Sequence, residues 1–157
     1  MTHLRPKLYR FALAFTRRTD EAEDVVQEIG LRLWERRAEL GAIRSIEAYA
    51  MSAIRNRCLD YARSPHNRSN EWDEAYDTVY EQTPYKKMEQ SDMAAFVRVL
   101  VDRLPEQQQM VIRLRDIEGY ELEEIVEILS MNDGAVRANL SRARQKVREE
   151  LLKIMKV

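Results

Sequence analysis

Cysteine, glycine, proline and histidine are scarce in this 157-residue chain, and each scarcity narrows the class of protein. The single cysteine, Cys58, excludes an internal disulfide, and its place on the apolar side of a predicted helix favours a buried thiol. Only four glycines and four prolines leave few helix breakers. His3 and His66 stand alone without ligand partners at useful spacing, so we predict no metal site and no cofactor.

Long apolar runs are also absent. The chain has no stretch of about 18 apolar residues, and its N-terminus lacks the charged, apolar and small-residue pattern of a signal peptide. We therefore expect a soluble, cytoplasmic protein.

Charged residues make up 34% of the chain, yet its net charge is only −1. A stand-alone DNA-binding protein is expected to be basic. Here residues 1–63 are slightly basic, residues 64–91 are acidic, and residues 92–157 are nearly balanced. Each half must therefore present a basic face and an acidic face.

Apolar residues recur at helical spacing over most of the chain, and no alternating strand pattern is present, which predicts an all-α fold. Residues 1–63 should form three helices, the second capped by Thr19 or Asp20 and the third by Ser45. The inward residues expected on these two helices are Ala22, Val25, Val26, Ile29, Leu33 and Trp34, and then Ile46, Tyr49, Ala50, Ala53, Ile54, Cys58 and Tyr61.

Residues 64–91 are polar and acidic and follow no sustained period. Pro65 ends the preceding helix, because proline lacks an N–H and disfavours helical geometry in the residue before it. We interpret this segment as a flexible linker between two small helical domains, residues 1–63 and 92–157.

The second domain should contain four helices. Pro105 suits the first turn of its second helix, and Gly119 should close that helix. Its expected apolar residues are Met93, Phe96, Val97, Leu100, Val101, Leu104, Met110, Val111, Leu114 and Ile117.

The stretch from Leu122 to Arg148 predicts a helix-turn-helix. An acidic helix carries Leu122, Ile125, Val126 and Leu129 on one face, and a polar turn follows at residues 130–132. Asn132 is a good N-cap for a second helix that starts near Asp133, with an apolar stripe formed by Val136, Leu140, Ala143, Val147 and Leu151. Five basic residues and no acid lie between Arg137 and Arg148. Such a run is often only a solvated helix face, but this two-helix context favours a helix that reads duplex DNA.

The whole chain resembles a bacterial sigma factor of the sigma-70 family, in the small extracytoplasmic-function group. DEAEDVVQEIGLRLW from Asp20 to Trp34 resembles region 2.2, and AIRNRCLDYAR from Ala53 to Arg63 is similar to region 2.4. LPEQQQMVIRLRDIEGYELEEIVEIL with the following NDGAVRANLSRAR resembles region 4. The chain departs from the usual pattern at Gly30, where an aromatic is frequent, at Val126 for alanine, at Ser130 for the turn glycine, and at Ala135 for threonine.

The resemblance implies a dissociable specificity subunit that binds core RNA polymerase, recognises the −10 and −35 promoter elements and helps to melt the DNA. It also implies an anti-sigma factor as a partner, and no catalytic residues. The polymerase contacts expected on this basis are Asp24, Gln27, Glu28 and Leu31. The expected −10 contacts are Arg44, Ser52, Arg55, Asn56 and Arg63, with Asp60 holding a neighbouring arginine. The expected −35 contacts are Asn132, Arg137, Ser141, Arg142, Arg144, Lys146 and Arg148.

Other interpretations of the residues remain open. An autonomous helix-turn-helix repressor or activator would need a symmetric dimer and a palindromic site. A helical adaptor that binds only protein would leave the basic helix as a solvated face. An enzyme is disfavoured, because no triad, metal cluster or phosphate loop occurs in the sequence.

Overall fold

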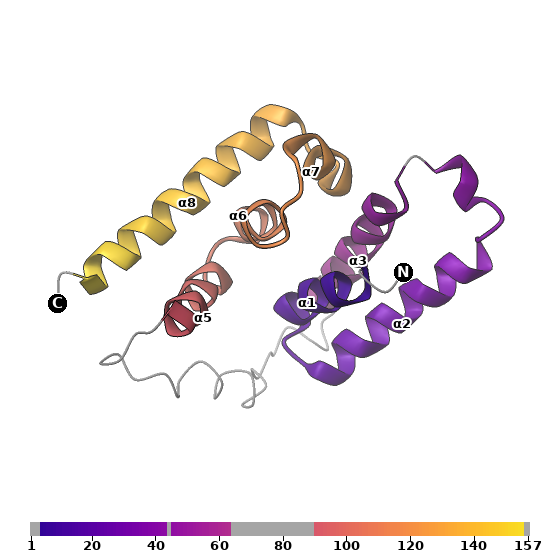
Figure 1. The fold of residues 1–157 in the computed structure, drawn as a ribbon, viewed down its shortest axis with the longest axis horizontal. Helices are drawn as coiled ribbons and strands as arrows, with labels where there is room; N and C mark the ends of the chain where they lie inside the picture. The colour runs from indigo at the N-terminus through magenta and orange to yellow at the C-terminus, as the bar shows by residue number, and fades with distance from the viewer. Residues whose placement is uncertain (1–3, 44, 64–89, 156–157) are drawn as a thin grey trace. The chain divides into compact units, whose positions relative to one another are not determined.

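The computed structural model describes residues 4–43, 45–63 and 90–155, and within these ranges it contains helices and no strand. The described residues divide into two compact units. One holds α1 (Leu4–Thr16), α2 (Thr19–Glu35), the short 3-10 helix η1 (Leu40–Ala42) and α3 (Ile46–Arg63) (Figure 1). The other holds α5 (Gln90–Asp102), α6 (Glu106–Ile112), the π-helical turn η2 (Arg113–Ile117), most of α7 (Leu122–Leu129), and α8 (Asp133–Met155). The predicted all-α fold with two small helical domains is confirmed.

In the first unit, α1, α2 and α3 pack on one another around an apolar core. Its largest fully buried side chains include Val25, Ile29 and Leu33 of α2 and Met51 and Ile54 of α3. The predicted cap of α3 is confirmed, since the Ser45 hydroxyl accepts a hydrogen bond from the Ala48 N–H at 3.1 Å. The predicted cap of α2 is wrong. Helix α2 already begins at Thr19, and Arg18 occupies the N-cap position without a side-chain hydrogen bond.

Two residues predicted to point inward in the first unit are exposed instead. Trp34 in the last turn of α2 is 63% exposed, and Ile46 at the start of α3 is 40% exposed. Both lie at helix ends, where the apolar face of the helix extends past the part that neighbouring helices cover. Met51 is fully buried although the sequence did not single it out.

In the second unit, the 23-residue α8 packs across α5 and α6 (Figure 1). Its predicted apolar stripe is buried at Val136, Leu140, Ala143 and Val147. Gly119 ends η2 with φ of +81°, a conformation that glycine adopts without a steric penalty. Ile117, predicted to be inward, is 36% exposed, because η2 turns with π-helical rather than α-helical geometry.

A buried polar network that the sequence did not reveal joins α5 to the segment that follows α6. Arg113 donates to the Asp102 carboxylate, and its Nε donates to the Gln109 side-chain oxygen at 3.2 Å. The Gln109 amide in turn donates to the Asp102 carbonyl at 3.3 Å. This network satisfies the charge of Arg113 inside the second unit.

The predicted linker falls mostly outside the described residues, which exclude 64–89. Helix α5 begins at Gln90, so the last two residues assigned to the linker are helical. Within the described residues, none of the helices combines the length and apolar character that a membrane crossing requires.

Candidate nucleic-acid and protein interfaces

The helix-turn-helix is formed by α7, the turn at residues 130–132 and α8. Ser130 takes the left-handed conformation, with φ of 52° and ψ of 41°, at the position where the family commonly has glycine. Asn132 then caps α8, because its side-chain oxygen accepts a hydrogen bond from the Ala135 N–H at 2.7 Å. The start of α8 at Asp133 confirms the predicted helix boundary.

All seven residues assigned to −35 contact are exposed. Asn132 caps α8, and the structure separates the other six into two sets. Four of them follow at spacings of four, three and four residues and line one hollow of about 640 Å³, namely Arg137, Ser141, Arg144 and Arg148. Arg115 of η2 and the α8 residues Gln145 and Glu149 also line this hollow, so four arginines and one carboxylate border it. Helical spacing puts Arg142 and Lys146 on the opposite edge of the exposed face, where Lys146 lines a different groove with Leu100 and Arg103.

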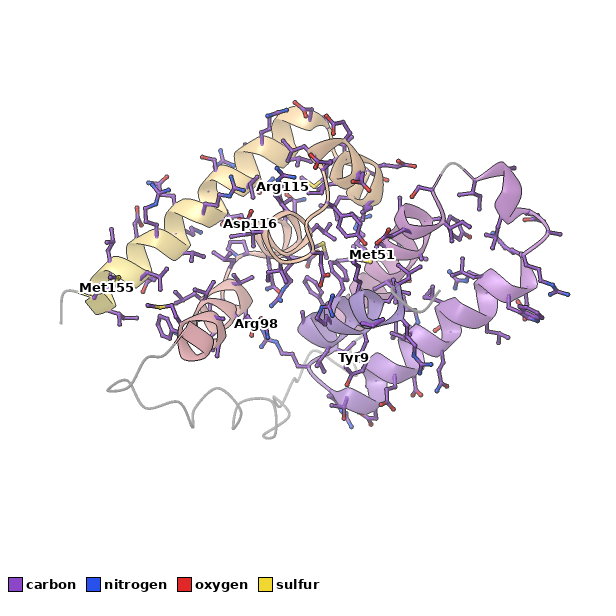
Figure 2. All side chains as sticks on the ribbon, viewed as in Figure 1. Tyr9, Met51, Arg98, Arg115, Asp116 and Met155 are labelled. Atoms are coloured by element: carbon purple, nitrogen blue, oxygen red, sulfur yellow. The ribbon has the colours of Figure 1, made fainter. Side chains whose placement is uncertain are left out.

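Arg115 is a basic residue of this hollow that sequence reasoning missed. Its guanidinium donates to the Tyr120 carbonyl at 2.9 Å and lies 3.4 Å from a Glu121 carboxylate oxygen. Figure 2 labels Arg115 and its neighbour Asp116 on the segment that packs beside α8. No local pattern assigns Arg115 to this surface, because it comes from the segment before the helix-turn-helix.

Besides Arg115, which pairs with Glu121, two arginines that α8 contributes to the hollow form ion pairs. Arg137 pairs with Asp133 one turn away on α8, with 2.8 Å between Nε and Oδ2. Arg144 pairs with Asp116 through two hydrogen bonds of 2.9 and 2.6 Å, and this bidentate contact raises the pKa of the Arg144 guanidinium. Within the described residues, Arg142, Lys146 and Arg148 form no ion pair.

The residues assigned to polymerase contact form an exposed row on α2. Asp24, Gln27, Glu28 and Leu31 are all exposed. Glu28 also accepts a hydrogen bond from Nε of Arg57 on α3 at 2.9 Å, and this bond raises the pKa of Arg57. Asp60 adds its negative field at Arg57.

Trp34 extends this row by one turn and was missed as a surface residue. Leu31 is 59% exposed and Trp34 is 63% exposed, and the Arg37 guanidinium lies 4.2 Å from the centroid of the Trp34 ring. Exposed large apolar side chains beside acidic ones are typical of a protein interface.

A groove of about 680 Å³ lies between α1 and α2 beside this row, and Gln27 borders both. Gly30 and Gln27 line it together with Tyr9, which is labelled in Figure 2. A Cβ added at Gly30 would meet no atom within 4 Å. The glycine therefore leaves space where the family commonly has an aromatic ring.

The residues assigned to −10 contact are described only in part. Arg55 donates to the Asn56 side-chain oxygen at 3.0 Å, which leaves the exposed Asn56 amide nitrogen directed elsewhere. Ser52, one turn earlier on α3, is half-buried. Arg44 and the side chain of Arg63 lie outside the described residues.

The described part of the chain contains neither a reactive thiol nor a cluster of metal-binding side chains. Burial raises the pKa of the Cys58 thiol to about 12, which confirms the predicted buried thiol. Among the described residues, no group of three or more His, Cys, Asp or Glu side chains is placed to hold a metal ion.

Family models match both units of the chain. The Sigma-70 region 2 family matches residues 1–68, and the Sigma-70 region 4 family matches residues 97–147. The chain therefore belongs to the sigma-70 family. Several of its relatives are extracytoplasmic-function sigma factors.

Individual relatives are similar over most of this chain. A probable RNA polymerase sigma factor, RfaY of Xanthomonas campestris, is 32% identical over 90% of this chain and 36% of its own length. The extracytoplasmic-function sigma factor SigE of Mycolicibacterium smegmatis is 29% identical over 94% of this chain and 58% of its own length. The chain thus spans about a third of the length of RfaY and somewhat over half of the length of SigE.

Solved structures share the fold. The sigma factor RpoE of Bartonella quintana, crystallised with the anti-sigma factor NepR, matches with a TM-score of 0.70 at 22% identity, over 99% of this chain and 94% of that one. CnrH in complex with the cytosolic domain of CnrY matches with a TM-score of 0.64 at 19% identity, over 92% and 80% of the two chains.

Proposed function

We propose that this chain is a sigma factor that binds core RNA polymerase, directs it to a promoter and assists DNA melting. The observation that carries the proposal is the pairing of two sigma-70 units in one chain, each with an exposed face of suitable chemistry. The chain itself makes and breaks no bond in this function, and it acts in the cytoplasm.

We place polymerase binding on α2. Asp24, Gln27, Glu28 and Leu31 form its exposed row, and Trp34 extends it. The carboxylates of Asp24 and Glu28 are repelled by DNA phosphates but suit a basic protein surface, and the two apolar side chains supply contact area. A partner helix with basic and apolar residues is complementary to this row.

We place −35 recognition on α8 and −10 recognition on α3 with the loop before it. Arg137, Ser141, Arg144 and Arg148 border one basic hollow, and Arg142 flanks the exposed face on its other edge. If about four of these basic residues contact phosphates, a plot of the logarithm of the DNA-binding constant against the logarithm of the salt concentration should have a slope of roughly −4. So few phosphate contacts are too few for tight DNA binding by the free chain, and this agrees with its net charge of −1. In the complex, the polymerase supplies further contacts.

We also propose an anti-sigma factor as a regulator. One structural neighbour was solved in complex with an anti-sigma factor, and the other in complex with the cytosolic domain of CnrY. In this chain the exposed row on α2 and the hollow on α8 are the surfaces that an inhibitor has to cover.

Run-off transcription tests the proposed function directly. Core polymerase is incubated with a promoter-containing template library, with and without the chain, and transcript ends are mapped. Initiation at defined sites only when the chain is present supports the proposal. Binding of the chain to a palindromic duplex without polymerase, with no change in transcription, would favour an autonomous repressor or activator instead.

A further inference from the structure

The ion pair between Asp116 and Arg144 joins two segments that lie 28 residues apart in the chain. Asp116 belongs to η2 and Arg144 to α8, and both are in the second unit. Arg144 donates from Nε to one carboxylate oxygen at 2.9 Å and from Nη2 to the other at 2.6 Å. This two-bond geometry matches the planar fork of a guanidinium to a carboxylate.

The pair lies at the edge of the basic hollow on α8. Arg144 lines that hollow beside Arg137 and Arg148, and it also lines a second groove of about 450 Å³ that Asp116 borders. Asp116 itself does not line the hollow. The carboxylate therefore holds the Arg144 guanidinium toward the second groove.

The pair between Arg137 and Asp133 gives a useful comparison. It rests on one hydrogen bond between residues one turn apart, and the two side chains are 60% and 62% exposed. The side chains of Arg144 and Asp116 are less exposed, at 47% and 37%. Single, highly exposed pairs contribute little and open easily, whereas bidentate pairs hold their geometry better.

A phosphate and a carboxylate compete for the same guanidinium donors. We infer that Asp116 restrains DNA binding by α8, because it holds the Arg144 guanidinium in a protein ion pair and so withholds one phosphate contact. This inference rests on the proposed function of α8 as a DNA-binding helix. It makes Asp116 a residue that keeps the free chain a weak DNA binder.

The test uses the full chain without polymerase and a short fluorescent duplex of random sequence, with binding followed by anisotropy. Asp116→Asn should tighten binding by about tenfold at about 50 mM salt, and the gain should shrink by about threefold by 200 mM, because one added phosphate contact steepens the salt slope by about 0.9. Circular dichroism and the Tm of each variant establish that it is folded.

Glu150→Gln is the matched control. It changes the net charge by the same amount and also breaks a surface ion pair, the one between Glu150 and Lys153 at 3.2 Å on α8. It should change the affinity by less than about twofold. In an Arg144→Gln background, Asp116→Asn should then have no comparable effect.

Four outcomes would overturn the inference. These are equal tightening by Glu150→Gln, tightening by Asp116→Asn that persists in the Arg144→Gln background, weaker binding by Asp116→Asn, and no measurable binding by any variant. Equal tightening by Glu150→Gln would mean that only net charge matters. Weaker binding by Asp116→Asn would mean that Asp116 positions Arg144 for DNA. Failure of run-off transcription, by contrast, would reject the sigma-factor function while leaving this affinity comparison intact.

Discussion

Asp102 and Arg113 form a buried ion pair that fastens the C-terminal end of α5 to the start of η2. Their side chains are only 4% and 11% exposed. A carboxylate at a helix C-terminus is unfavourable for the helix dipole, and the arginine offsets this cost.

Removing one partner of this pair should strongly destabilise the second unit. Asp102→Ala leaves the Arg113 charge buried without its partner, and should lower the free energy of unfolding by about 3–5 kcal/mol. Urea unfolding followed by circular dichroism measures the loss. The double variant Asp102→Leu with Arg113→Met should lose much less, because it removes both charges. A loss below about 1 kcal/mol for Asp102→Ala would show that the pair is not the structural tie that its burial indicates.

Ser130 pays a conformational cost in the turn of the helix-turn-helix. Its φ of 52° is in the left-handed region, which costs a residue with a Cβ about 1–2 kcal/mol. Ser130→Gly should therefore raise the free energy of unfolding by about 1 kcal/mol, measured as a higher Tm. Ser130→Ala keeps the Cβ and should give no such gain. Equal stabilisation by alanine would contradict the backbone explanation.

Cys58 should make the first unit sensitive to alkaline pH. Burial raises the thiol pKa from an ordinary value near 9 to about 12, so the folded thiol stays protonated where the unfolded one ionises. The unfolded state then binds fewer protons, and stability falls as pH rises between about 9 and 12, by up to about 1.4 kcal/mol per pH unit. Urea unfolding at several pH values measures this slope.

The control for this effect is Cys58→Ala, which removes the titrating group. The variant should be less stable than the parent at pH 7 because of the lost packing, but its stability should fall less steeply above pH 9. Parallel slopes for the two proteins would exclude Cys58 as the cause.

Two arginines on opposite edges of α8 should be needed for −35 recognition. Arg137→Ala with Arg142→Ala should weaken promoter binding by the polymerase complex by about tenfold or more, and should reduce the salt slope by about one for each of the two arginines that meets a phosphate. Affinity for core polymerase, measured separately by fluorescence titration, should not change. Equal loss of both activities would mean that α8 has a structural role and does not read DNA.

Leu31 and Trp34 should be needed for polymerase binding. Leu31→Ala with Trp34→Ala removes the two exposed apolar side chains of the α2 row and should weaken the affinity for core polymerase by at least about tenfold, since truncated interface anchors typically cost 2 kcal/mol or more. Ile46→Ala is the control, because Ile46 is an exposed apolar residue of the same unit outside this row. Equal effects of the two changes would argue against an interface on α2.

The caps show which features of the structure were predictable from local sequence. Asn132 and Ser45 accept hydrogen bonds from backbone N–H groups three residues later, so the residues involved are neighbours in the chain. The buried stripe of α8 was equally accessible, because its period of 3.6 residues is a property of the helix itself. The sigma-70 resemblance rested on the same kind of local pattern, repeated in a fixed order along the chain.

Exposure at helix ends was not predictable in this way. Periodicity assigns Trp34 and Ile46 to inward faces, and both are exposed. A periodic pattern indicates which side of a helix is apolar, but the length and packing of the neighbouring helices decide how far along the helix that side is covered.

The sequence by itself determined the class of fold, the two sigma-70 units, the turn before α8 and the one-sided basic charge of that helix, because each depends on residues within a few positions of one another. Only the tertiary structure decided how those charges are used. It pairs Arg144 with Asp116, Glu28 with Arg57, and Arg113 with Asp102, and it gathers Arg115 with the arginines of α8. These partners are between 11 and 29 residues apart in the chain, and packing of helices brings them within hydrogen-bonding distance.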